Sequence, residues 1–136
     1  MFNLLRVDIA SPYYDPAFAD HLTEVLSAPG MAARIIDDSK IYHEEPRIKI
    51  FKIKLNENEQ IIIEIVNTSI LISARDNTGK QSKAFDGYIL YDVTEKKLID
   101  MITDGEAHAI YPYTAKSRIV LLDPDGDIVD YTFVKP

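Results

Sequence analysis

Residues 47–76 read RIKIFKIKLNENEQIIIEIVNTSILISARD, and this stretch decides the fold class. From Arg47 to Leu55, apolar residues alternate with basic ones, which is typical of a β-strand with one buried and one solvent-exposed face. The alternation changes phase at Ile50–Phe51, and this predicts a β-bulge at that point. The polar loop Asn56–Glu59 leads into the apolar run Gln60–Asn67, so the two segments are predicted to form a hairpin.

The pattern of short strands and polar turns continues to the end of the chain. A further strand is predicted at Ile70–Arg75 and is closed by the turn Asp76–Lys80. Two more hairpins are predicted, one from Tyr88–Val93 and Leu98–Thr103 and the other from Arg118–Leu122 and Ile128–Val134. The turn of the last hairpin is Asp123-Pro-Asp-Gly-Asp127, in which proline presets one backbone angle and glycine supplies the positive φ needed for the return.

A single helix is predicted before these strands, at Asp15–Ala28. Asp15 can cap the first turn, Pro16 suits the first helical position, and apolar residues then repeat at helical spacing up to Pro29–Gly30. With about seven or eight strands, the chain is predicted to be α+β and mostly antiparallel β, forming a β-sandwich or a partly closed β-barrel with one N-terminal helix.

Composition limits the classes of function. The chain has 136 residues without an internal repeat or a linker-like tract, so residues 1–136 are expected to form a single domain. It has no cysteine, which excludes disulfides, thiolate catalysis and cysteine-ligated metals. The net charge of -7 opposes binding to nucleic acid. No apolar run approaches the ~20 residues of a membrane span, and no export signal is recognised, so we expect a cytoplasmic protein without a membrane association.

No motif for catalysis, metal or cofactor binding is present in the sequence. The histidines, His21, His43 and His108, are far apart, and no serine lies in a nucleophile elbow. Asp123, Asp125 and Asp127 superficially resemble a calcium loop, but glycine comes too early and valine occupies the twelfth place. We therefore expect no metal, no cofactor and no enzyme activity. One alternative, a divergent hydrolase or isomerase that uses His43 or His108 with nearby carboxylates, stays open.

Acidic and tyrosine side chains in predicted loops favour binding to a basic protein. Acidic residues outnumber basic ones before Arg47, and another acidic tract forms the last turn. Tyrosine anchors interfaces well because it combines apolar area with a hydroxyl and few rotatable bonds. The predicted partner-binding residues are Asp37, Asp38, Tyr42, Glu44, Glu45, Asp123, Asp125 and Asp127. A plainer interpretation is that the acidity serves solubility alone.

In overall character the chain resembles the small acidic immunity proteins that bacteria encode beside secreted or contact-delivered toxins. The shared features are small size, acidity, lack of cysteine, lack of a catalytic motif and a β-rich body with an acidic face. The resemblance implies a cytoplasmic antitoxin that binds and neutralises one basic, nuclease-type toxin domain. Another alternative is a small-ligand-binding β-barrel, in which strands 61–66 and 88–93 would face a cavity.

Overall fold

The computed structural model describes residues 6–27, 34–114 and 117–136. These residues form a helix, α2 (Pro16–Ser27), a short 3-10 helix, η1 (Asp38–Lys40), and nine strands. The strands are β1 (His43–Glu45), β2 (Ile48–Lys54), β3 (Glu59–Val66), β4 (Ser69–Asp76), β5 (Ile89–Asp92), β6 (Lys97–Met101), β7 (Glu106–Ile110), β8 (Ile119–Leu122) and β9 (Thr132–Phe133). The predicted α+β class with mostly antiparallel strands is confirmed.

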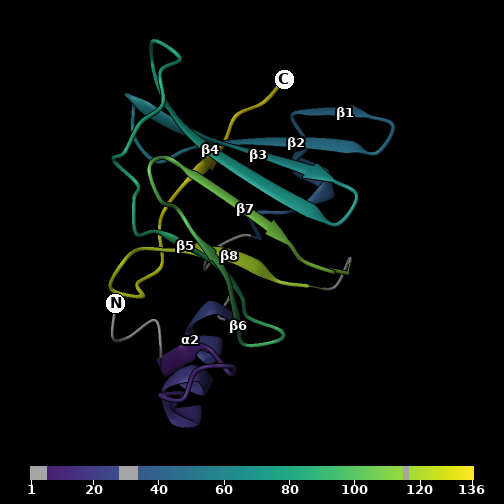
Figure 1. The fold of residues 1–136 in the computed structure, drawn as a ribbon. Coiled ribbons are helices and arrows are strands. Elements are labelled where there is room, and N and C mark those ends of the chain that lie inside the picture. The colour runs from purple at the N-terminus through teal and green to yellow at the C-terminus, as the bar shows by residue number, and fades with distance from the viewer. Residues whose placement is uncertain (1–5, 28–33, 115–116) are drawn as a thin grey trace.

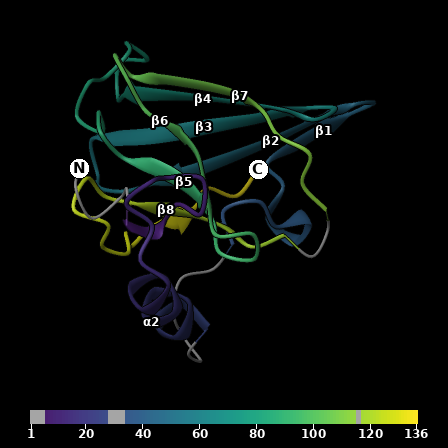
Figure 2. The same cartoon turned by 60° about the horizontal axis from the view of Figure 1, so that its bottom comes forward.

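The strands form two separate sheets, so the fold is sandwich-like. The large sheet has six strands in the order β1-β2-β3-β4-β7, with β9 also paired to β2, and the small sheet has the order β6-β5-β8. Figures 1 and 2 show the small sheet between the large sheet and α2, which gives three layers. The predicted hairpins β2–β3 and β5–β6 and the strand β4 are confirmed.

The small sheet is buried on both faces because it separates two hydrophobic cores. Alternate residues of β5 and β8, such as Leu90 and Leu121, pack against the isoleucine-rich inner face of the large sheet. The intervening residues, such as Tyr91 and Val120, pack against Leu22 and Leu26 of α2. The alternative of a ligand-binding barrel places strands 61–66 and 88–93 around a cavity. In the structure, these strands supply side chains to packed cores.

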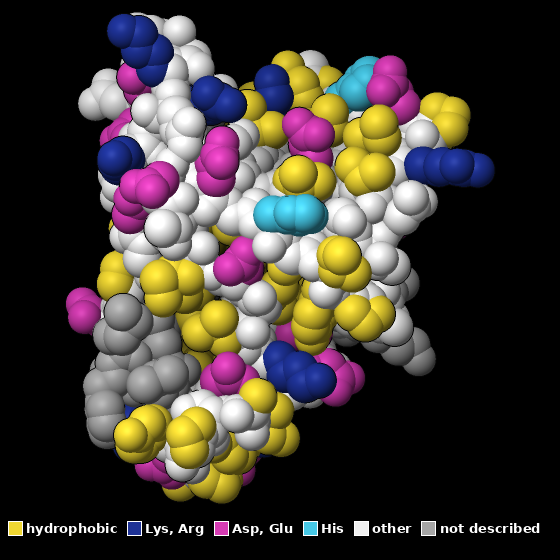
Figure 3. All heavy atoms as spheres, viewed as in Figure 1, with side chains coloured by type: hydrophobic (Ala, Val, Ile, Leu, Met, Phe, Trp, Pro, Cys, Tyr) yellow, Lys and Arg dark blue, Asp and Glu magenta, His cyan; other side chains and the backbone are white. Residues whose placement is uncertain are grey.

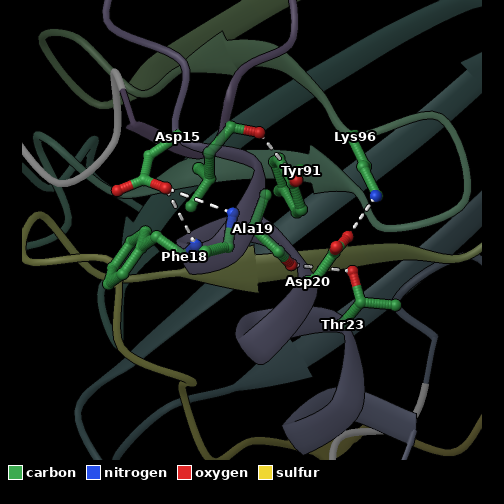
Figure 4. A network of polar contacts seen from close by, with 9 residues as sticks. Asp15, Phe18, Ala19, Asp20, Thr23, Tyr91 and Lys96 are labelled. Atoms are coloured by element: carbon green, nitrogen blue, oxygen red, sulfur yellow. Dashed lines mark hydrogen bonds and ion pairs between the residues drawn. The ribbon is translucent and has the colours of Figure 1, made fainter.

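The helix begins where the sequence predicts. Asp15 is its N-cap, since its Oδ1 atom accepts hydrogen bonds from the backbone N–H groups of Ala17 at 3.1 Å and Phe18 at 3.3 Å. Figure 4 shows two further links: the Lys96 ammonium pairs with Asp20, and the Tyr91 hydroxyl donates to the Val7 carbonyl at 2.8 Å. The predicted end at Ala28 and Pro29–Gly30 lies outside the described residues.

The predicted β-bulge at Ile50–Phe51 is wrong. Strands β2 and β3 pair without interruption from Ile48 opposite Val66 to Lys54 opposite Gln60. The phase change arises because β2 carries apolar residues on both faces: Phe51 and Ile53 point into the core, while Ile48 and Ile50 lie on the outer face with Lys52 and Lys54. A register shift occurs instead between β5 and β6, at Leu90/Tyr91.

The predicted hairpin of Arg118–Leu122 with Ile128–Val134 is correct only at its turn. The Asp123 N–H donates to the Asp127 carbonyl at 2.9 Å, and Gly126 has the expected positive φ of 85°. Ile128 makes one bridge to Leu122, after which the chain crosses to the large sheet, where β9 pairs with Ile53 and Lys54 of β2. The crossing is possible because β1 occupies only the first part of that edge of β2.

Candidate functional site

Five of the predicted partner-binding residues lie on one surface, which we call the acidic rim: Asp37, Asp38, Tyr42, Glu44 and Glu45. The rim is built from η1 and β1 and borders two neighbouring hollows. One hollow, of about 560 Å³, is lined in part by Glu44 and Glu45, and the other, of about 260 Å³, by Asp37 and Asp38. Both hollows contain Lys49 and Tyr113, so these two residues connect the two halves of the rim.

Lys49 neutralises part of this surface. Its Nζ atom lies 3.0 Å from Asp38 Oδ1, and the Asp38 side chain is 69% exposed. The hydrogen bond to Asp38 raises the pKa of Lys49, although partial burial opposes the shift, and Glu44 adds a smaller attraction. Asp38 is therefore already paired. The lining of one hollow also contains Arg47 and that of the other Arg34, so basic side chains equal the carboxylates in number in each lining.

Asp37 has a structural role in the rim. Its Oδ1 atom accepts hydrogen bonds from the Ser39 backbone N–H at 3.0 Å and the Ser39 hydroxyl at 2.8 Å, which caps η1. Burial raises the pKa of Asp37, but the hydrogen bonds from Ser39 and the charges of Arg34 and Lys40 outweigh it, so the pKa is lowered. Asp37 thus stays charged while it holds the turn.

Tyr42 and Tyr113 are half-buried in the rim. The Lys52 ammonium lies 4.1 Å from the centroid of the Tyr42 ring, which is the geometry of a cation–π contact. The Tyr42 N–H also donates to the Ile50 carbonyl at 2.8 Å. Burial raises the pKa of the Tyr113 hydroxyl, with Lys49 acting in the opposite direction. Both rings are therefore held in place before any partner binds.

Glu44 and Glu45 are the most accessible carboxylates on β1, where every side chain is exposed. Glu45 Oε1 lies 3.6 Å from His43 Nε2, and both side chains are more than half exposed. This arrangement puts His43 at an open surface, where solvent screens the pair. It gives the hydrolase alternative no cleft around His43.

Asp123, Asp125 and Asp127 do not belong to the acidic rim. The rim lies near the start of β8, where the Ile35 N–H donates to the Ile119 carbonyl, whereas Asp123 follows the last residue of that strand. Their carboxylates come within 4.8 Å of one another, but Asp123 Oδ1 already accepts the N–H groups of Asp125 and Asp127 at 2.9 Å. A turn accounts for the cluster, and the absence of a metal stays a prediction.

His108 lies in a third hollow, on the outer face of the large sheet. The lining of this hollow also contains Glu64, Asp100 and Glu106. Asp100 is held by the backbone, because it accepts the N–H groups of Met101 at 2.8 Å and His108 at 2.9 Å. Within the described ranges, no three of these four residues place ligand atoms close enough together to hold a metal ion.

The structure also shows a buried acidic residue that the sequence did not single out. Asp92 is 0% exposed. Its Oδ1 atom accepts the N–H groups of Thr94 at 2.9 Å and Glu95 at 3.1 Å, and its Oδ2 atom accepts the Tyr111 hydroxyl at 2.8 Å. The local signal, an aspartate two residues before a threonine at a strand end, predicts the turn contacts but not the distant tyrosine.

Two further findings do not concern this site. None of the helices in the described part of the chain is both long enough and apolar enough to cross a membrane. No protein family, no curated protein and no solved structure gives a significant match to this chain.

Proposed function

We propose that the chain is a cytoplasmic immunity protein, which binds and neutralises a basic, nuclease-type toxin domain through the acidic rim. The observation that supports this most is the gathering of Asp37, Asp38, Glu44 and Glu45 around two hollows that share Lys49 and Tyr113. The acidic residues lie within nine positions of sequence, and the fold adds Tyr113 and Lys49 to the surface that they form.

The two kinds of rim residue support different steps of binding. Exposed carboxylates attract a basic protein over a distance and raise the association rate, in a way that salt weakens. Tyr42 and Tyr113 offer apolar area with few rotatable bonds, and such contacts mainly slow dissociation. The proposal therefore separates into two measurable rates.

Glu44 and Glu45 are the best positions for testing the electrostatic step. Both are exposed on a three-residue edge strand, so their replacement leaves the cores untouched. Asp37 caps η1 and Asp38 pairs with Lys49, so changing either of these residues also alters the local structure.

The test begins with the isolation of the partner from the native host by pull-down and mass spectrometry, followed by binding kinetics over a range of salt concentrations. We expect the double variant Glu44→Lys/Glu45→Lys to associate about 10-fold or more slowly at low salt and to lose most of its salt dependence. Tyr42→Ala should chiefly accelerate dissociation.

The matched control is Asp125→Lys/Asp127→Lys, which makes the same change of charge in the turn after β8. This control should bind at the wild-type rate apart from a small effect of net charge. If association is indifferent to both salt and the Glu44/Glu45 reversal, the rim is not the docking surface and the acidity serves solubility.

A further inference from the structure

The outer face of the large sheet is uncovered by the described residues. Figure 2 shows the small sheet and α2 on the same side of the large sheet, which leaves the opposite side open. The pairing registers arrange the outward side chains of this face in rows across the strands. The first row is Glu45, Ile48, Val66, Ser69 and Ile110; the second is His43, Ile50, Glu64, Leu71 and His108; the third is Lys52, Ile62, Ser73 and Glu106.

This face carries more apolar side chains than a solvated sheet face usually does. Antiparallel sheets with one wet face place polar residues at the outward positions. Here six of the outward residues are aliphatic: Ile48, Ile50, Ile62, Val66, Leu71 and Ile110. Leu71 is 37% exposed and Ile110 is 76% exposed. Exposed aliphatic side chains on an uncovered sheet face favour an interaction surface.

The charges on the face are mixed and unevenly distributed. Lys52 and Lys54 lie on β2, whereas Glu106 lies on β7 at the other side of the sheet. Beside Glu106 is a hollow of about 590 Å³ whose lining includes three carboxylates and no lysine or arginine. Figure 3 shows this face, with hydrophobic side chains next to acidic and histidine ones. A partner whose surface carries a single sign of charge would meet like charge on one side of this face. A partner surface that carries both signs can place each charge opposite its complement.

We propose that a second copy of this chain docks on this face, related to the first by a two-fold axis that runs along the strands between β3 and β4. This axis places β2 of each copy over β7 of the other. Lys52 then lies opposite Glu106, and Ile48 lies opposite Ile110, each twice by symmetry. The Lys52 ammonium of each copy reaches the acidic hollow of the other copy.

The alternative two-fold axis, which runs across the strands, pairs the face less well. It sets β2 against β2 and β7 against β7, which brings the lysines of the two copies together and the acidic hollows of the two copies together. The axis along the strands leaves β1 outside the overlapping strands, so Glu44 and Glu45 stay open in the dimer, whereas Tyr42 adjoins the interface through Lys52. The inference does not rest on the proposed function.

The size of the face sets the expected affinity. Four strands about 4.8 Å apart and about five residues long cover only a modest area. Two such faces bury less than the ~1,000 Å² of total surface at which stable specific interfaces begin, which is the size range of weak, transient association. We therefore expect a dimer that dissociates in the micromolar range.

Sedimentation velocity over micromolar concentrations tests the proposal. The wild-type protein should shift from monomer to dimer as its concentration rises, and Ile110→Glu should weaken the dimer at least about 10-fold because a carboxylate replaces an apolar contact. The matched control is Ile9→Glu, at an isoleucine that is 50% exposed and lies by the β5–β6 turn, away from the outer face. This control should dimerise like the wild type.

A charge exchange tests the axis itself. Lys52→Glu and Glu106→Lys should each weaken the dimer, because each sets like charges opposite one another twice. The double variant Lys52→Glu/Glu106→Lys restores opposite charges and should recover the affinity to within about 3-fold. Circular dichroism and the melting temperature of each variant would show that the monomer is intact. A protein that stays monomeric throughout, a dimer unaffected by Ile110→Glu, or a double variant that does not recover would overturn the proposal.

Discussion

Asp92 shows how one residue connects three parts of the fold. Its carboxylate is fully buried, yet each oxygen accepts hydrogen bonds: one from the turn between β5 and β6, the other from Tyr111 just after β7. A buried charge is costly unless it is hydrogen-bonded. The Tyr111 hydroxyl is therefore part of the environment that keeps Asp92 inside, and burial together with Asp92 raises the pKa of Tyr111.

We predict that Tyr111→Phe lowers the free energy of unfolding by about 1–3 kcal/mol, since Asp92 Oδ2 loses its hydroxyl donor within the protein interior. Urea unfolding at neutral pH measures this change. The control is Tyr42→Phe, which keeps the ring beneath Lys52 and should change stability by less than about 0.5 kcal/mol. Equal effects from the two variants would mean that Asp92 does not depend on Tyr111.

At the scale of elements, α2 is held mainly by one apolar face. Leu22 and Leu26 pack against Ile89, Tyr91 and Val120 of the small sheet. The opposite side of the helix is exposed, and Asp20 on that side pairs with Lys96, with its side chain 62% exposed. Exposed ion pairs contribute little to stability because water screens them.

Leu22→Ala should accordingly destabilise the protein by roughly 2–4 kcal/mol, through lost burial and the cavity left behind. Asp20→Ala should cost well under 1 kcal/mol, about the value of a surface ion pair. Chemical denaturation of both variants beside the wild type gives the comparison. Similar losses for the two substitutions would contradict the assigned buried face of α2.

The elements that could be predicted are those with local signals. The helix has its cap at Asp15, and the hairpins have polar turns between apolar runs. Strands β1 and β7 were not predicted. HEE, the sequence of β1, has no alternation, and EAHAI, the sequence of β7, alternates mainly through alanine, which is uncommon in strands. They become strands because β2 and β4 offer them an edge with which to pair. The pairing of β9 with β2 was not predicted for the same reason, because the sequence of a strand does not show which sheet edge it pairs with.

The candidate site was predictable as a set of residues but not as a surface. Asp37 to Glu45 gather because η1 and β1 are adjacent in sequence, whereas the separation of Asp123–Asp127 from them depends on the direction of β8. Lys49 joins the rim through its pairing opposite Glu44 in the β1–β2 hairpin, whereas Tyr113 joins it through tertiary packing. No local pattern indicates such a contact.

At the scale of the whole molecule, several aspartates make stability sensitive to acid. The pKa of Asp15 is lowered by its hydrogen bonds with Arg6 and Phe18, and that of Asp76 by its hydrogen bond with the Thr78 hydroxyl. The pKa of Asp37 is lowered as well. The unfolded chain, with ordinary pKa values near 3.8, then binds more protons in acid than the folded chain does.

This contribution to stability is complete above the ordinary aspartate pKa and is lost as the pH falls through the lowered folded-state values. We expect the urea midpoint to fall between pH 5 and pH 3, and to fall less in Asp15→Asn. Asparagine can still cap α2, but it does not titrate in this range. If the variant and the wild type lose the same stability over this interval, Asp15 is not among the responsible groups.

The double burial of the small sheet has a consequence for how this sequence can change during evolution. Ile89, Leu90 and Tyr91 of β5 and every residue of β8 face one core or the other, so a polar substitution at any of these positions places an unsatisfied group in the interior. The strands of the large sheet have outward positions at which substitutions can accumulate, and the turns tolerate substitutions even more readily. Divergent descendants of this chain would therefore keep two short hydrophobic blocks, Ile89–Tyr91 and Ile119–Leu122, long after the rest of the sequence had become unrecognisable.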